Sequence, residues 1–149
     1  MKRVLLMSVG FLFVLTALIA LPSGHAATTC KEPQKIALKS GMKVIAEIAG
    51  PNWCVARIES LKGEDITVKY AVGGEDVLNS EEVIPHPSIL YKDNSYPCFK
   101  KGDKVIAKSN GDIWREATIN SVDGDNVNVT FLNKKEVTLK QSELARAPK

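Results

Sequence analysis

The sequence contains two copies of one short segment, and this duplication constrains the fold more than any other feature. Shifted by 61 residues without a gap, segment 39–87 aligns with segment 100–148. The identical positions include turn glycines, alternating apolar residues and one tryptophan in each copy. They are Gly41, Lys43, Val44, Ile45, Ala46, Gly50, Trp53, Ala56, Ile58, Gly63, Val68, Glu75, Leu78 and Glu82, matched by Gly102, Lys104, Val105, Ile106, Ala107, Gly111, Trp114, Ala117, Ile119, Gly124, Val129, Glu136, Leu139 and Glu143. A fixed period of this kind predicts one small module that occurs twice in tandem.

The start of the chain has the layout of a secretory signal peptide. Lys2 and Arg3 precede an apolar run over residues 4–21, which is followed by small residues suited to signal peptidase. We expect residues 1–26 to be removed, which leaves residues 27–38 as an N-terminal arm. The protein is then exported, either periplasmic or secreted, with no membrane insertion after cleavage. The alternative is an uncleaved anchor, because the apolar run approaches the roughly 20 residues that span a bilayer.

The exported part of the chain is almost neutral. Without Lys2 and Arg3, 18 of the 20 basic residues face 17 acidic ones, so the formal charge falls from +3 to +1. A chain without a concentrated positive field is not expected to bind nucleic acid.

Three cysteines follow the leader, at Cys30, Cys54 and Cys98, so at most one disulfide can form within the chain. Cys54 has the alternation phase of an inward-facing strand position, and we favour the pair Cys30 with Cys98. A Cys54 with Cys98 bridge stays open at this point. A single histidine after the leader, His86, and no Cys-x-x-Cys motif argue against a zinc site, and nothing indicates a cofactor.

Each repeat reads as a series of short strands separated by glycine turns. Apolar residues alternate with polar ones along these stretches, a period of two that is typical of half-buried strands. We expect strands at 42–47, 53–59, 66–70 and 75–79 in the first copy, and at 103–108, 114–120, 127–131 and 136–140 in the second. A short 3₁₀ turn is expected after the fourth strand, at 80–83 and 141–144.

These elements predict an all-β chain of two small barrels. Four or five short strands within some 50 residues are too few for two stacked sheets, so one bent barrel per repeat is the economical solution. We place the first barrel at 39–87, a connector at 88–98 and the second barrel at 99–149. Apolar residues of the connector, Ile89 to Tyr91, are expected to pack on a barrel.

The strand and turn pattern resembles the Tudor branch of the SH3-like barrels, over most of the chain after the leader. The motifs that carry the resemblance are Gly102-Asp103-Lys104-Val105-Ile106-Ala107, Trp114-Arg115-Glu116-Ala117-Thr118-Ile119, Val127-Asn128-Val129-Thr130-Phe131 and Ser142-Glu143-Leu144, with Trp53-Cys54-Val55-Ala56-Arg57-Ile58 and Val68-Lys69-Tyr70 in the first copy. Agenet and plant-type Tudor repeats share the same motifs, so the resemblance does not choose among these subfamilies.

The resemblance implies candidate ligand-binding residues. Tudor relatives hold a methylated Lys or Arg in a cage of aromatic rings. Trp53 and Tyr70, with Trp114 and Phe131 in the second copy, fall at two cage positions per barrel. The remaining cage positions carry no ring, since they hold Ala49 and Gly73 in the first copy and Ser109 and Lys134 in the second. We therefore do not carry methyl-lysine recognition over to this chain.

Two roles are open for the tryptophans. Trp53 and Trp114 can cover the open ends of their barrels as packing residues, which is a common use of large aromatic side chains. Alternatively, Trp53 with Tyr70, and Trp114 with Phe131, line a shallow groove for a peptide, because exposed aromatic residues often anchor interfaces.

The sequence favours a non-enzymatic binding module over an enzyme. After the leader, one histidine, scattered carboxylates and no nucleophile beside a base provide no catalytic set. The leading hypothesis is an exported tandem Tudor-like module that binds a protein or peptide through the barrel faces or the seam between the repeats. The alternative is a cell-envelope module that binds peptidoglycan or another glycan, which fold analogy alone supports.

Overall fold

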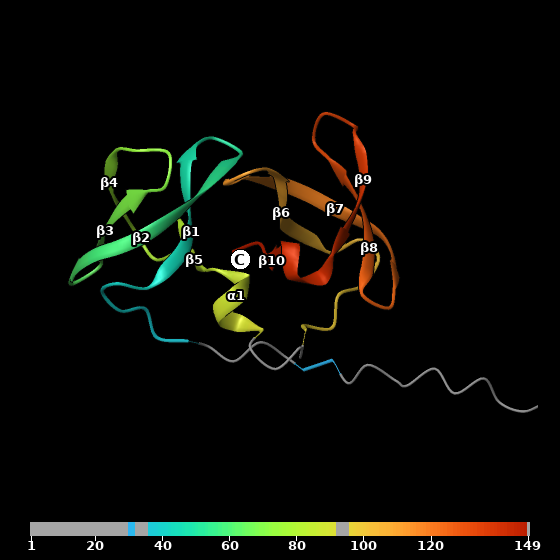
Figure 1. Cartoon of the computed structure of the whole chain (residues 1–149), viewed down its shortest axis with the longest axis horizontal. Coiled ribbons are helices and arrows are strands. Elements are labelled where there is room, and N and C mark those ends of the chain that lie inside the picture. Colours follow the sequence, from blue (N-terminus) through green and yellow to red (C-terminus); the bar gives the residue numbers. More distant parts are fainter. Residues whose placement is uncertain (1–29, 32–35, 92–95, 149) are drawn as a thin grey trace, which may run out of the picture.

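Each repeat forms a small, strongly bent five-stranded barrel, and the two barrels lie side by side (Figure 1). The computed structural model describes residues 30–31, 36–91 and 96–148, so the expected signal peptide at 1–26 lies outside the described residues. The first barrel comprises β1 Lys43–Ala49, β2 Asn52–Lys62, β3 Asp65–Tyr70, β4 Glu75–Leu78 and β5 Val83–Pro85. The second comprises β6 Lys104–Asn110, β7 Ile113–Asp123, β8 Asn126–Phe131, β9 Glu136–Lys140 and β10 Leu144–Arg146. The predicted all-β class with two tandem barrels is confirmed.

The structure adds elements that the repeat pattern did not reveal. A fifth strand of three residues closes each barrel, β5 on β1 and β10 on β6. The predicted 3₁₀ turn is present in the second copy as η1, Gln141–Glu143, whereas residues 80–82 of the first copy form an ordinary turn and bend. The prediction for the first copy is therefore wrong. There Asn79 caps the turn, its side-chain oxygen accepting from the Glu81 backbone N–H at 2.8 Å.

The long strands β2 and β7 bend at equivalent places. The register shifts between Ile58 and Ser60 when β2 pairs with β3, and between Ile119 and Ser121 when β7 pairs with β8. Such bulges bend a strand and let one strand serve both sides of a small barrel. The hairpin turn that follows β2 uses Gly63 at φ 65°, a backbone conformation that favours glycine.

Each barrel has its own core, built from the inward triplets that the alternation predicted. In β3 these are Ile66, Val68 and Tyr70, and in β8 they are Val127, Val129 and Phe131. All six side chains are buried. A module of about 50 residues has a marginal core by itself, so further contacts are needed to stabilise it.

The two barrels are joined by a direct strand pairing that forms one ten-stranded sheet. Residues 52–54 of β2 pair antiparallel with residues 113–115 of β7, and Trp53 lies opposite Trp114. Because these residues are equivalent in the two repeats, the barrels are related by an approximate twofold axis between the tryptophans. A third core cluster surrounds that axis, formed by Ile45, Trp53, Val55, Ile106, Trp114 and Ala145.

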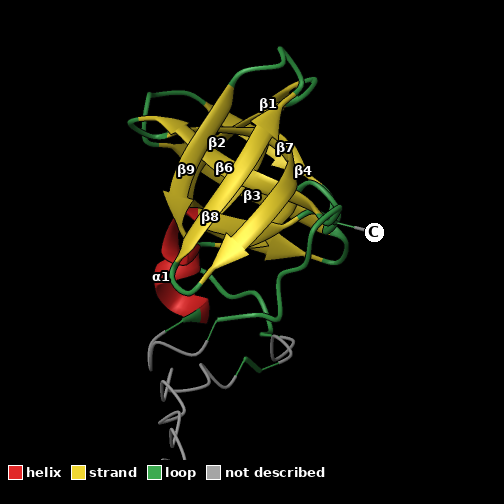
Figure 2. Cartoon of the chain, turned by 90° about the vertical axis from the view of Figure 1, so that its right-hand side faces the viewer, coloured by secondary structure: helices red, strands yellow, loops and turns green. Residues whose placement is uncertain are grey.

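A single helical turn, α1 Pro87–Leu90, lies at the start of the connector and contacts both barrels (Figures 1 and 2). The sequence predicted no helix there. Ile89 packs against the core of the first barrel. Tyr91 is buried, and its hydroxyl donates to the Leu144 carbonyl of the second barrel at 3.2 Å. The expectation that these residues pack on a barrel is thus confirmed, and they contact both. No helix in the described part of the chain is long and apolar enough to cross a membrane.

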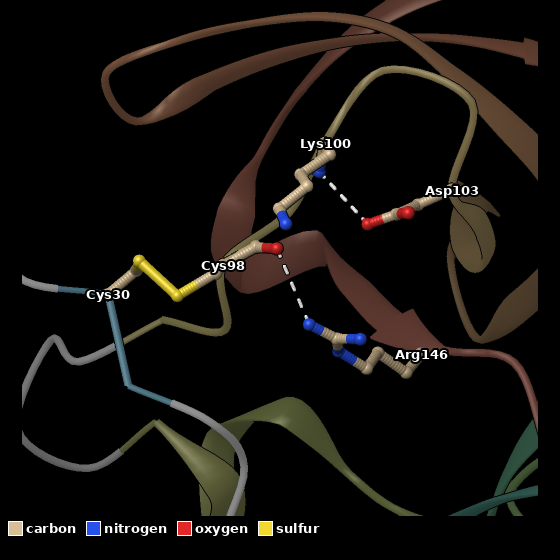
Figure 3. Close-up of a disulfide and its surroundings, with 5 residues drawn as sticks. All are labelled: Cys30, Cys98, Lys100, Asp103 and Arg146. Atoms are coloured by element: carbon tan, nitrogen blue, oxygen red, sulfur yellow. Dashed lines mark hydrogen bonds between the residues drawn. A yellow bond between two sulfur atoms is a disulfide. The ribbon is translucent and has the colours of Figure 1, made fainter.

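The disulfide joins Cys30 to Cys98, which is the favoured pairing (Figure 3). It spans a sequence separation of 68 residues, with the two Cα atoms 4.9 Å apart, and ties the N-terminal arm to the segment leading into the second barrel. The Arg146 guanidinium donates to the Cys98 carbonyl at 3.4 Å, which brings the bridge to the end of β10. Cys54 is buried as a free thiol, and desolvation raises its pKa.

Candidate ligand-binding seam

The four aromatic residues predicted as ligand-binding are all buried. Trp53, Trp114, Tyr70 and Phe131 are only 4%, 2%, 6% and 6% exposed, respectively. This burial contradicts the exposed groove, one of the two roles left open by the sequence: Trp53 and Trp114 pack between the barrels, and Tyr70 and Phe131 pack in the cores of their own barrels. The structure agrees better with the packing role. Each tryptophan, however, packs against the neighbouring barrel and does not close the open end of its own. Ligand binding by these rings stays a prediction.

The predicted aromatic pairs are also separated by the fold. Trp53 and Trp114 belong to the cluster between the barrels, whereas Tyr70 and Phe131 belong to the two barrel cores. The Tyr70 hydroxyl donates to the Glu47 carbonyl at 2.6 Å, and burial, followed by the charge of Asp76, raises its pKa to about 12. Tyr70 therefore serves as a neutral structural donor that fixes the end of β1.

The two indole N–H groups at the twofold axis are buried without a hydrogen-bond partner among the described residues. Burying an indole N–H without an acceptor is unusual, since buried polar groups are generally paired. Each of these tryptophans also forms part of the wall of a surface cleft, Trp53 on one side of the seam and Trp114 on the other.

The cleft beside Trp53 has a volume of about 520 Å³ and carries an excess of acidic side chains. We call it the acidic cleft. Its charged lining residues are Glu47, Glu81, Glu82, Glu116 and Lys104, and its apolar ones include Val105, Leu132 and Pro148. It draws residues from both barrels, so it exists only because the barrels are docked.

A second, larger hollow of about 1020 Å³ continues from the acidic cleft along the first barrel. We call it the apolar groove, because most of its lining is apolar: Ile36, Ala37, Leu38, Leu61, Ile66, Val83, Ile84, Pro85 and Pro148. Asn79, Glu81 and Pro148 line both hollows, so the two adjoin on the surface. We refer to the two together as the composite groove.

The cleft beside Trp114 is the repeat-related counterpart of the acidic cleft, but its charge is different. Its volume is about 440 Å³, and we call it the basic cleft. Lys108 stands where the acidic cleft has Glu47, and Lys140 where it has Asn79. Lys43 of the basic cleft is the repeat equivalent of Lys104 of the acidic cleft, so each cleft has a lysine at this position. The two faces of the seam are therefore chemically distinct despite the shared backbone.

His86 lies in the basic cleft at the N-terminal end of α1. Its Nδ1 accepts from the Ser88 backbone N–H at 3.2 Å, and its ring meets Trp114 edge-on with centroids 5.6 Å apart. Burial, reinforced by the charges of Lys43 and Lys108, lowers the pKa of His86 to about 4. The imidazole is therefore neutral at physiological pH and acts as a helix cap.

This low pKa predicts that folding stability falls on acidification. Between pH 6.5 and pH 4 the unfolded chain binds a proton at His86 that the folded protein does not, so stability rises with pH in that window. We expect a change on the order of 1–2 kcal/mol after solvent screening is allowed for. His86→Asn keeps a capping acceptor without titrating. Urea denaturation at pH 4 and pH 7 should show a smaller pH difference in this variant, and an equal difference would contradict the assignment.

The seam offers binding chemistry and no visible catalytic chemistry. Among the described residues, no three His, Cys, Asp or Glu side chains are placed to hold a metal ion, and this includes the four glutamates of the acidic cleft. Cys54, the free thiol, is buried with a raised pKa, which disfavours the reactive thiolate.

Sequence reasoning missed the carboxylates that dominate the seam. Aligning the repeats already shows Glu47 against Lys108 and Glu116 against Val55, so the charge difference was visible as a departure from the repeat. Its placement in one cleft was not, because that requires the docking of β2 on β7.

Comparisons with known proteins concern the fold. No protein-family profile and no curated protein sequence matches the chain. Among solved structures, the AGD34 unit of Arabidopsis thaliana AGDP1 is similar at 17% identity, with a TM-score of 0.49, over 72% of this chain and 81% of that one. The tandem Agenet domain 3-4 of ADCP1 is similar at 17% identity, with a TM-score of 0.46, over 72% of this chain and 79% of that one.

Proposed function

We propose that this protein is an exported, non-enzymatic module that binds a protein or peptide segment in the composite groove. The observation that carries the proposal is that the acidic cleft adjoins the apolar groove at Asn79, Glu81 and Pro148. A depression with apolar walls and a few polar groups is the usual form of a recognition site. Its two volumes, about 520 and 1020 Å³, suit several consecutive residues of a ligand chain.

The mechanism is rigid presentation of a preformed surface. The strand pairing at the seam, the connector helix and the disulfide fix the barrels relative to one another. A preorganised groove loses little conformational entropy when a ligand binds, which favours affinity. The signal-peptide layout of residues 1–26 supports export, so the ligand would be met outside the cytoplasm.

The glycan alternative has less support. Sugar recognition by stacking needs accessible ring faces, and Trp53, Tyr70, Trp114 and Phe131 are at most 6% exposed. Co-sedimentation with purified cell wall that survives blocking of the composite groove would favour the glycan reading over the peptide one.

A peptide-display selection on the immobilised protein tests the proposal. Leu61 lines the apolar groove and is 39% exposed, and its repeat equivalent Val122 is also 39% exposed but does not line the composite groove. We expect selected peptides to bind the Leu61→Gln variant roughly fivefold more weakly, because an apolar contact is lost. Val122→Gln is the matched control and should bind as wild type does. A selection that enriches no peptide sensitive to Leu61 would overturn the proposal.

A further inference from the structure

The acidic cleft carries negative charge that the described residues leave uncompensated. Four glutamates and one lysine line it, and none of these glutamates forms an ion pair with another described residue inside the cleft. Glu82 has a structural task, since its carboxylate accepts from the Asn79 backbone N–H at 2.9 Å. Glu47 and Glu116, which come from different barrels, form no side-chain hydrogen bond within the described part of the chain, and they line the cleft from both sides.

The basic cleft provides an internal comparison, because there two of the three lysines already have acidic partners. Lys108 lies 3.9 Å from Glu143, and Lys140 lies 3.5 Å from Asp125. Lys140 also donates to the Asn126 side-chain oxygen at 2.7 Å. The same backbone thus supports one face with mostly paired lysines and one face with surplus carboxylates. A surface that keeps like charges together without partners favours an oppositely charged ligand.

Trp53 forms the buried part of the wall of the acidic cleft. Its side chain is 4% exposed, it forms part of the wall of the acidic cleft, and its indole N–H has no acceptor among the described residues. Trp114 is in the same condition at the basic cleft. The buried indole is therefore common to both clefts, and the charge of the other lining residues distinguishes them.

We propose that the composite groove selects an extended segment with cationic and apolar residues. This inference rests on the proposed function. A Lys or Arg side chain of the ligand occupies the acidic cleft between Glu47 and Glu116, and flanking apolar residues lie along the apolar groove. The four glutamates do not form a group that could hold a metal ion, which fits an organic cation on a flexible stem better than a metal. The segment belongs to a protein and not to a nucleic acid, whose charge is of the wrong sign.

Binding of three peptide pools tests this selection. The pools have equal length and random apolar composition, and two central positions are fixed as Lys, Gln or Glu. We expect the Lys pool to be retained at least fivefold better than the Gln pool, and the Glu pool least, with the preference falling as salt is raised because exposed charges are screened.

Matched variants locate the effect. Glu47→Gln with Glu116→Gln removes two charges from the acidic cleft, whereas Glu75→Gln with Glu136→Gln removes two from exposed, repeat-related positions on β4 and β9. The first pair should reduce retention of the Lys pool about fivefold or more, and the second less than twofold. Unchanged thermal midpoints establish that both variants are folded.

The outcomes separate the two proposals. A Lys preference that disappears in the Glu47 and Glu116 variant supports cationic selection. Equal retention of all three pools, still reduced by Leu61→Gln, overturns cationic selection and leaves the peptide-binding function in place. No retention of any pool overturns both.

Discussion

Replacing Trp53 by alanine is expected to lower the free energy of unfolding by about 3–5 kcal/mol, the range found for removing a large buried aromatic side chain. The indole is 4% exposed and packs at the axis between the barrels, opposite Trp114. The surrounding side chains cannot fill so large a cavity completely. The expected loss is a large share of the roughly 5–15 kcal/mol that keeps a domain folded. Urea denaturation followed by circular dichroism measures it.

The same experiment includes an exposed control residue and the repeat-equivalent tryptophan. Val77 is 58% exposed, so Val77→Ala should change stability by less than about 0.5 kcal/mol. Trp114→Ala should lose as much as Trp53→Ala, whereas the double variant should lose less than the sum, because both side chains belong to one buried cluster. A Trp53→Ala protein as stable as Val77→Ala would show that the barrels do not depend on the cluster between them.

Removing the disulfide is the second large effect, with an expected loss of about 2–4 kcal/mol. Cys30 and Cys98 close a loop with a sequence separation of 68 that contains the whole first barrel. A link across so long a loop restricts the unfolded chain strongly. The Cys30→Ala, Cys98→Ala double variant should therefore unfold at lower urea than the oxidised protein, as measured by circular dichroism.

Adding a reductant separates the effect of losing the disulfide from the effect of the two Cys→Ala substitutions themselves. Oxidised wild type should fall to the stability of the double variant when dithiothreitol is added, while the double variant should not respond. Cys54 is present and buried in both proteins, so its thiol does not contribute to the difference. A wild-type midpoint that is indifferent to reductant would contradict this account.

The barrels were predictable from the sequence because the evidence for them lies within one repeat. Alternation placed Ile66, Val68 and Tyr70 on one face of a strand, and the structure buries all three. The three-residue strands β5 and β10 were not predictable, since so short a stretch carries no period.

The docking of the barrels was harder to predict, although its trace is present in β2. Residues 53–56 are buried without alternation: Cys54 and Ala56 face the core of their own barrel, and Trp53 and Val55 face the other barrel. A continuous apolar run is the mark of a strand covered on both faces. Within one repeat, however, that run does not reveal which element covers the second face, so an exposed position for the aromatic rings stayed open.

The candidate site depended on that missing step. Glu47 and Glu116 are far apart in sequence, and only the approximate twofold axis brings them to one cleft. The duplication explains why the fold repeats, and the departures from it, such as Glu47 against Lys108, mark where the two copies have separate tasks.

The pairing of β2 with β7 also bears on solubility. A strand with unpaired backbone groups and an apolar side chain beside them is a template for association with other chains. Here residues 52–54 and 113–115 satisfy one another and cover Trp53 and Trp114 at the same time. A single barrel released from the chain would expose both the strand and the indole. Duplication in this protein therefore protects each copy from aggregation.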